Sequence, residues 1–247
     1  MYVPHFRKKS NNVPILRRNE IDEIAERYVF DYCPDALRHP QPLDIDFFIE
    51  GYLGLMLDYQ FLSNNGMYLG MTVFNDTSKI PVYIPEEGRA DYLSASSGTV
   101  IIDTCLTTES NLNRYRYTCG HEAGHWIFHR AYYNYNPSQL TLFEMDDPFI
   151  VCRELSPKEL IPSTNTWDDM RWMEWQADKF SSCFLMPKTA VIKLISQSDI
   201  SSEREAGLIH LVSNAFHVSK KAASYRLIDL GIMRSSAQKL QLSFSER

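Results

Sequence analysis

Residues 112–130 read LNRYRYTCGHEAGHWIFHR, and within them His121, Glu122 and His125 form the pattern HExxH. Two histidines four positions apart on a helix lie on one face, about one turn apart, so both imidazoles can reach the same ion. The glutamate that follows the first histidine projects beside that ion, where it can accept a proton from metal-bound water. The spacing therefore predicts two metal ligands and, at Glu122, the general base of a hydrolytic site.

A later segment, EWQAD at residues 174–178, supplies two carboxylates four positions apart. A catalytic zinc usually has three protein ligands and leaves its fourth position to water, so one more ligand is needed. Glu174 is the expected third ligand. Asp178 lies one helical turn further along, where it is expected to accept the free ring N–H of one histidine and fix its tautomer.

Both segments also have ordinary structural explanations. Gly120 and Gly124 each cost a helix about 1 kcal/mol relative to alanine, and such a local conflict is typical of a functional site. The alternative is a buried helix with hydrogen-bonded histidines and glycines at a close packing contact. The second segment begins at a predicted N-cap, Thr166, and ends before Pro187. Its apolar stripe comprises Met170, Met173, Ala177, Phe180 and Phe184, and its carboxylates could simply face solvent.

A further histidine, His129, continues the face of the first helix. We interpret it as a structural or pocket-lining residue rather than as a metal ligand. An acyl-transfer site also needs a donor for the developing oxyanion. His129, Tyr132, Tyr133 and Tyr135 are all candidates for this donor, and the sequence does not choose among them.

Together, the segments HEAGHWIFH and EWQADKFSSCFLMP resemble the ImmA/IrrE family of metallopeptidases, over roughly residues 40 to 230. The resemblance implies one zinc ion bound by His121, His125 and Glu174, with Glu122 as the base. It implies an α+β fold with a zincin-like core, in which a small sheet packs on the HExxH helix and helices follow at the C-terminus. It also implies a protein substrate such as a helix-turn-helix transcriptional repressor, whose cleavage would derepress phage, mobile-element or stress genes.

The chain has 247 residues, of which 44% are apolar, enough for one sizeable core with small appendages. Its composition changes along its length. The predicted units are a basic N-terminal arm at 1–18, a zincin-like metallopeptidase domain at 19–200, a C-terminal helical extension that is similar to a helix-turn-helix at 201–235, and a polar tail at 236–247.

The five cysteines are odd in number and show no C-x-x-C spacing, which favours a reducing compartment. The N-terminal residues lack the apolar run of a secretory signal, and no stretch reaches the length that spans a membrane. We therefore expect a cytoplasmic protein with no membrane partner. Imidazole and carboxylate ligands favour zinc, although manganese or iron could occupy them.

Outside the two motif segments, the pattern predicts helices at 20–32, 44–57 and 188–197, a small antiparallel or mixed sheet over 60–103, and a strand at 148–155. The run GTVIID, residues 98–103, stands directly before the metal helix. We predict that it forms the edge of the active-site cleft and holds an extended peptide by main-chain hydrogen bonds. A central position in the sheet would contradict this prediction.

Residues 207–233 are expected to form two helices with a turn at Val218-Ser219, superficially a helix-turn-helix. Lys220, Lys221 and Arg226 are its main positive groups, fewer than DNA-binding helices usually carry. The whole chain has a net charge of −6, which fits direct nucleic-acid binding poorly. The leading hypothesis is thus a zinc-dependent endopeptidase. The rivals are a non-catalytic zinc-binding regulator that acts by binding a protein, and a DNA-binding protein.

Overall fold

The computed structural model describes residues 1–133, 149–153, 168–198 and 205–234. Its helices are α1 (Arg18–Tyr32), α2 (Asp35–Arg38), α3 (Ile45–Phe47), α4 (Leu112–Tyr133), α5 (Asp169–Leu185), α6 (Lys188–Ser196), α7 (Glu205–Phe216) and α8 (Lys220–Asp229), with a π-helical turn at Phe48–Tyr52 and 3₁₀ turns at Thr104–Thr107 and Glu109–Asn111. Its strands are β1 (Met56–Gln60), β2 (Tyr68–Val73), β3 (Thr77–Ile84), β4 (Arg89–Ala95), β5 (Thr99–Asp103) and β6 (Phe149–Arg153). The predicted α+β class is confirmed.

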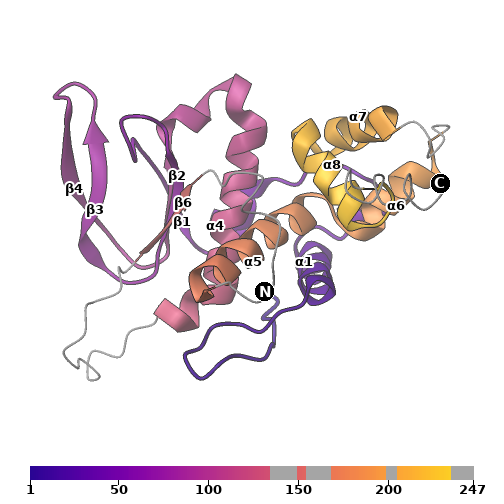
Figure 1. The fold of residues 1–247 in the computed structure, drawn as a ribbon, viewed down its shortest axis with the longest axis horizontal. Helices are drawn as coiled ribbons and strands as arrows, with labels where there is room; N and C mark the ends of the chain where they lie inside the picture. Colours follow the sequence, from indigo (N-terminus) through magenta and orange to yellow (C-terminus); the bar gives the residue numbers. More distant parts are fainter. Residues whose placement is uncertain (134–148, 154–167, 199–204, 235–247) are drawn as a thin grey trace, which may run out of the picture.

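The elements form successive layers, with the strands at one side of Figure 1 and most of the helices at the other. Helix α4 lies against the four-stranded sheet, α5 packs beside α4, and α1 and the C-terminal helices lie beyond α5. The β3–β4 hairpin covers the opposite face of the sheet through a separate apolar cluster that includes Met71, Ile80 and Ile101. Helix α4 is therefore held between the sheet and α5, which is the position that the metal-binding pattern needs.

Strand β5 lies inside the sheet, whose order is β1-β5-β2-β6, so the prediction that GTVIID forms the cleft edge is wrong. It pairs in parallel with β1 and antiparallel with β2. All of its residues are buried, because α4 covers one of its faces and the hairpin covers the other. A continuous apolar run without polar alternation is typical of such a doubly covered strand, and this was the signal against an edge position.

The edges of the described sheet are β1 and β6. On β1, two carboxylates accept hydrogen bonds from the backbone N–H groups that do not pair with β5. Leu57 donates its backbone N–H to Glu50 at 3.5 Å, and Tyr59 donates its N–H to Asp58 at 2.8 Å. Charged groups that occupy edge amides hinder the addition of another strand. These contacts argue against β1 as the edge at which another strand would add.

Most predicted elements are confirmed within four residues at each end, including α1, α4, β6, α6 and the pair α7–α8 with its turn at Val218-Ser219. The helix predicted at 44–57 is wrong in its second half, because helical structure ends at Tyr52 and β1 begins at Met56. Between them, Gly54 adopts a φ of +69°, a left-handed conformation that ends helices and that glycine adopts without strain.

The N-cap of helix α5 lies two residues later than predicted. Asp168, rather than Thr166, is the N-cap, and its side chain accepts from the backbone N–H of Arg171 at 2.8 Å; Thr166 itself lies outside the described residues. Four members of the predicted apolar stripe are fully buried, but Met170 is 43% exposed and does not belong to the core. The rest of the stripe faces α1 and α4, so the predicted orientation of the helix is confirmed.

The core continues from the α4–α5 pair into the C-terminal helices through a buried cluster of charges. Arg226 of α8 is fully buried and donates to Asp22 of α1 at 2.5 Å and to Asp229 at 3.0 Å. Lys179 of α5 pairs with the same two carboxylates. Burial alone would raise the pKa of Asp22, but the hydrogen bond and charge of Arg226 hold it below its ordinary value. Three helices from distant parts of the chain are thus joined at one point.

No helix within the described residues combines the length and the apolar character needed to cross a bilayer.

Candidate metal centre

The two long helices approach closely because two glycines of α4 face α5. A Cβ atom on Gly124 would lie 3.1 Å from the Cα of Ala177 and 3.2 Å from its carbonyl oxygen. A Cβ atom on Gly120 would lie 2.6 Å from the hydroxyl of Ser181. A larger residue at position 124, or at position 120 with the Ser181 hydroxyl in place, would hold the helices apart. The glycines that weaken the helix as an isolated element therefore bring the α5 carboxylates within reach of the α4 histidines.

We expect Gly124→Ala to lower both the free energy of unfolding and the affinity for zinc. Overpacking of a buried contact costs about 1–3 kcal/mol, which outweighs the roughly 1 kcal/mol that alanine contributes to a helix. Urea unfolding and competition with a chromophoric zinc chelator measure the two effects. Gly120→Ala combined with Ser181→Ala is the control, because loss of the hydroxyl removes its closest contact. Unchanged zinc affinity in Gly124→Ala would contradict the proposed role of this packing.

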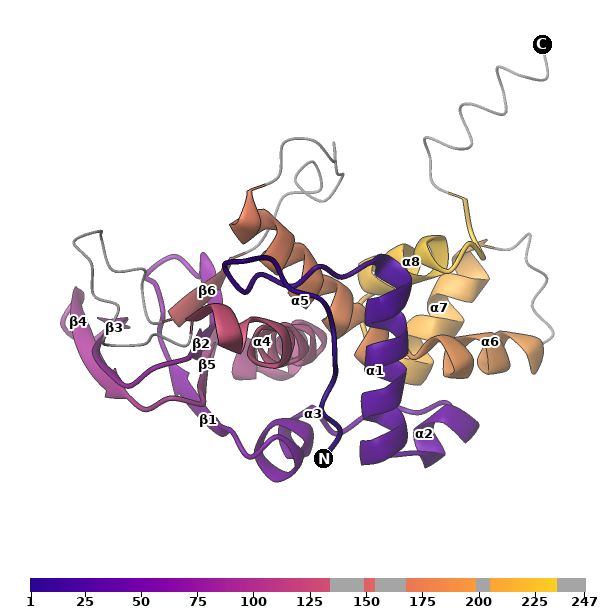
Figure 2. The same ribbon diagram turned by 90° about the horizontal axis from the view of Figure 1, so that it is seen from below.

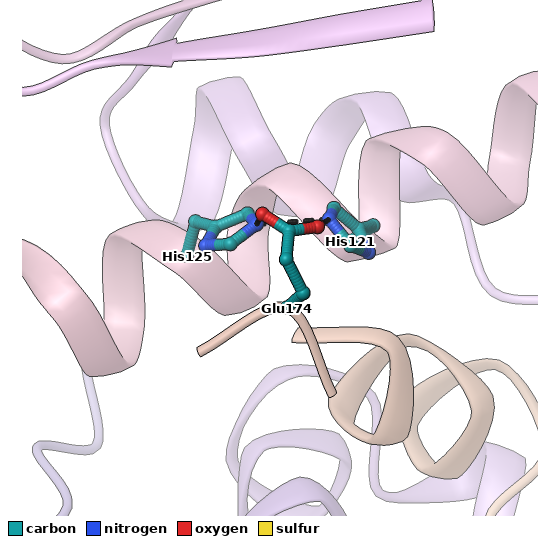
Figure 3. Close-up of side chains that lie close together, drawn as sticks. All are labelled: His121, His125 and Glu174. Carbon is teal, nitrogen blue, oxygen red and sulfur yellow. Dashed lines mark hydrogen bonds and ion pairs between the residues drawn. The ribbon is translucent and has the colours of Figure 1, made fainter. Parts of the chain in front are cut away.

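The predicted ligands converge. The Nε2 atoms of His121 and His125 are 2.8 Å apart, and the two Glu174 oxygens lie 3.4 Å and 3.5 Å from them. Figure 3 shows the Glu174 carboxylate facing both imidazoles across the gap between α4 and α5. The histidines are almost wholly buried, whereas the Glu174 side chain keeps 17% of its surface exposed. Side chains of both helices thus reach a common point, and the Glu174 side chain is its most exposed member.

The chemistry of this cluster fits a cation. Asp178 lies 2.9 Å from Nδ1 of His121, so Nδ1 carries the proton and Nε2 presents a lone pair to the centre. The ligand atoms of His121, His125 and Glu174 all lie within 4.8 Å of one another. Acceptor atoms gathered in a buried place are favourable only around a positive charge. Two imidazole nitrogens and one carboxylate are a ligand set typical of catalytic zinc, so these residues fit the ion predicted from the sequence.

The candidate base, Glu122, is fully buried beside the ligands. Its Oε2 accepts from the hydroxyl of Thr72 on β2 at 2.6 Å, while Oε1 has no hydrogen-bond partner among the described residues. Burial raises the pKa of this carboxyl to about 8, despite the opposing effect of His121. Gly70 makes room for the side chain, since a Cβ there would lie 2.7 Å from Oε1. Glu122 is therefore a carboxyl held in one orientation with one oxygen still available.

The raised pKa predicts how stability changes with pH in the metal-free protein. Between the ordinary carboxyl pKa of 4.5 and the folded value of about 8, folded Glu122 keeps a proton that the unfolded chain releases. Wild-type stability therefore falls as pH rises through this window, whereas glutamine does not titrate. We expect the stability of Glu122→Gln relative to wild type to increase from about pH 5 to about pH 8. Urea unfolding with excess chelator measures it; a constant difference would contradict burial of an ionisable carboxyl.

The other sequence candidates that the structure describes already have contacts within the protein, and Tyr132 packs edge-on against Tyr133. His129 uses both ring nitrogens within the protein, facing Nδ1 of His125 at 2.9 Å and Oε1 of Gln176 at 3.0 Å. This leaves neither nitrogen to donate to a substrate. Tyr133 is buried and stacks on Phe74 with ring centroids 4.4 Å apart. Tyr135 lies outside the described residues.

Three residues of the site did not stand out in the sequence, namely Gly70, Thr72 and Gln176. Gly70 carried a usable signal, because an isolated glycine inside a strand often marks the close approach of another group. The threonine and the glutamine carried none. Both are common in strands and helices, and only the packing of β2 and α5 against α4 gives them their partners.

A second group with ligand-type side chains consists of Asp22, Cys183 and Asp229. This group already contains its positive charges, since Arg226 and Lys179 pair with both carboxylates. Burial also raises the pKa of the Cys183 thiol, which opposes the thiolate that a metal requires. We therefore assign this group to the structure of the core.

Residues 149–228 match the family model of the M78 peptidases, described as the IrrE N-terminal-like domain. The match includes β6, α5 with Glu174 and Asp178, and the helices that follow; α4 precedes it. It confirms the resemblance to the ImmA/IrrE family that the sequence motifs predicted. No curated protein matches the chain.

Proposed function

Because residues 149–228 match the IrrE N-terminal-like family of M78 peptidases, we propose that this protein is a zinc-dependent endopeptidase with a zincin-like core. The observation that carries the proposal is the meeting of His121, His125 and Glu174 beside a buried carboxyl. The family match covers only the α5 side of this arrangement. The α4 side is supported independently, by the HExxH spacing and by the distances between the ligand atoms.

Each residue of the site has a distinct task in peptide hydrolysis. His121, His125 and Glu174 hold the ion, which when bound lowers the pKa of water and polarises the substrate carbonyl. Glu122 accepts the proton of the attacking water at Oε1 and later delivers it to the leaving amine. Thr72 fixes the orientation of Glu122 through Oε2.

The sheet suggests how an extended substrate binds. Strand β6 is an edge strand, pairs with β2 and packs beside α4. The other described edge, β1, already has its outward amides bonded to Glu50 and Asp58. A peptide that added to β6 would form main-chain hydrogen bonds, with side-chain pockets providing selectivity. We therefore move the proposed cleft edge from β5 to β6.

We further propose a protein substrate of the helix-turn-helix repressor type, on the strength of the family resemblance. The test incubates the full-length protein, loaded with zinc, with a repressor encoded beside its gene. Mass spectrometry then identifies any new termini. We expect one or a few cuts, loss of cleavage with a chelator, and recovery when zinc is restored.

The same experiment separates the rival functions. Cleavage that survives chelation would contradict a metal-dependent peptidase. Stable zinc binding with a repressor complex but no cut would favour the non-catalytic zinc-binding regulator. A mobility-shift assay in which the protein binds operator DNA in the absence of the repressor would favour direct DNA binding through α7 and α8.

A further inference from the structure

A buried chain of hydrogen bonds runs from the second histidine ligand to the N-terminal arm. Nδ1 of His125 lies 2.9 Å from Nδ1 of His129, whose Nε2 lies 3.0 Å from Oε1 of Gln176. The amide nitrogen of Gln176 in turn donates to the backbone carbonyl of Pro14 at 3.0 Å. The three side chains are each at most 1% exposed. Four groups from α4, α5 and the arm are thus connected without contact with solvent.

The direction of each of these hydrogen bonds follows from the last acceptor in the series, the backbone carbonyl of Pro14. A carbonyl can only accept, so the NH₂ group of Gln176 faces Pro14 and its oxygen faces His129. The His129 Nε2 must then carry the proton, which leaves its Nδ1 as an acceptor. His125 must therefore donate from Nδ1 and present the lone pair of Nε2 to the metal position. No other placement of the protons satisfies all three contacts with neutral rings.

We propose that Gln176 and His129 are positioning residues for the zinc ligand His125, and that the N-terminal arm supports the metal site through the carbonyl of Pro14. The inference rests on the proposed metal site but not on peptidase activity. Partners of this kind fix the tautomer and orientation of a ligating histidine, and their loss typically lowers metal affinity about 10–100-fold. The arm would thus affect zinc binding without touching the ion.

The arm is held in place by contacts of its own. Residues 7–15 fold back on themselves, with Lys9 N–H bonded to Val13 O at 2.8 Å and Ile15 N–H bonded to Arg7 O at 2.8 Å. Asn12 takes a left-handed φ of 68° at the turn. The Val13 side chain is fully buried in a cluster with Phe74, Tyr133 and Met173.

Polar contacts add to this docking. Lys9 and Asn11 both bond to Asp169, in the first turn of α5. Figure 2 shows the arm crossing beside α5 before it enters α1. A segment fixed at both sides of Pro14 holds that carbonyl at a defined distance from Gln176. Because coupling between two binding events is reciprocal, bound zinc should also stabilise the docked arm.

The first test measures zinc affinity by chelator competition in full-length variants. Gln176→Met keeps the length and apolar bulk of the side chain but removes both hydrogen bonds, and we expect an affinity about 10–100-fold lower than wild type. Ser181→Ala is the matched control, because it removes a buried bond from the same helix to the Tyr117 carbonyl at 2.8 Å without touching a ligand partner. We expect the control to bind zinc as wild type does. Equal affinities in the two variants would overturn the proposal.

A double-mutant cycle tests whether both residues act through one route. His129→Leu should lower zinc affinity by a similar factor, and adding Gln176→Met to it should cause no further loss. Independent, additive losses of zinc affinity would show that Gln176 acts on the site in another way. They would overturn the proposed hydrogen-bond route through His129.

Two measurements on wild type need no substitution, and therefore remain decisive if a variant fails to fold. Long-range ¹⁵N NMR of the histidine rings should place the proton of His129 on Nε2 and that of His125 on Nδ1. A proton on Nδ1 of His129 would overturn the proposal. Hydrogen exchange at residues 7–15 should slow when zinc is added to the metal-free protein, and identical exchange with and without zinc would contradict coupling to the arm. None of these measurements uses peptidase activity as a readout. A failure of the proposed peptidase function can therefore be told apart from a failure of this proposal.

Discussion

Glu122→Gln should retain zinc and lose about 10²–10⁴-fold in kcat, the usual contribution of a positioned general base. Glutamine keeps the shape of the side chain and can still accept from the Thr72 hydroxyl, which in wild type bonds to Oε2 at 2.6 Å. It cannot accept a proton from water. Because Glu122 is not a ligand, zinc affinity should stay close to that of wild type. Steady-state kinetics on a cleavable peptide and chelator competition together measure the two quantities.

The control for this prediction is Thr72→Val, which keeps the base and removes only the hydroxyl that orients it. We expect a smaller loss in kcat than for Glu122→Gln, with zinc affinity again unchanged. Full activity of Glu122→Gln would exclude this carboxyl as the base. A parallel loss of zinc would instead contradict the expectation that Glu122 does not contribute to zinc binding.

Glu174→Gln should weaken zinc binding by more than about 100-fold, a larger loss than the 10–100-fold typical of partners outside the ligand set. The two carboxylate oxygens face the two imidazoles at 3.4 Å and 3.5 Å, so a neutral amide would remove the only negative ligand of the proposed set. Asp178→Asn should weaken zinc binding by only about 10–100-fold. The Asp178 carboxylate does not contact the ion in the proposed site, because it acts through Nδ1 of His121. Equilibrium competition with chelators of graded affinity resolves the two cases.

Asp168→Asn is the matched control for Glu174→Gln. It removes one negative charge at the start of the same helix, while asparagine still caps the N-terminus as well as aspartate does. We expect wild-type zinc affinity, which would show that the effect at Glu174 is one of ligation rather than of net charge. Equal affinity in Glu174→Gln and wild type would refute the assignment of the third ligand, and with it the proposed peptidase.

The central part of the site was predictable because helical spacing converts sequence separation into geometry. His121 and His125 on α4, and Glu174 and Asp178 on α5, each lie one turn apart, so each pair needed only a helix to be placed correctly. The meeting of the two helices was harder to predict from the sequence. The glycines at 120 and 124 indicated a close contact, but only the fold shows that α5 is the partner.

Other features depended on tertiary packing that leaves no periodic signal. The position of β5 inside the sheet follows from its pairing with β1 on one side and β2 on the other, although its uniformly apolar sequence was compatible with it. The helix predicted to run to Leu57 ended early because a left-handed glycine intervened. The link from Gln176 to Pro14 joins residues 162 positions apart, and neither type of residue points to the other.

The buried charges that join α1, α5 and α8 bear on how the chain can be shortened. Asp22 and Arg226 are 204 positions apart, and the guanidinium that neutralises Asp22 is fully buried. A chain that ended before α8 would lose Arg226 and Asp229 together, and with them the contacts that join α8 to α1, α5 and α7. The C-terminal helices are therefore an integral part of the scaffold that carries the candidate metal site, and removal of α8 should destabilise that scaffold.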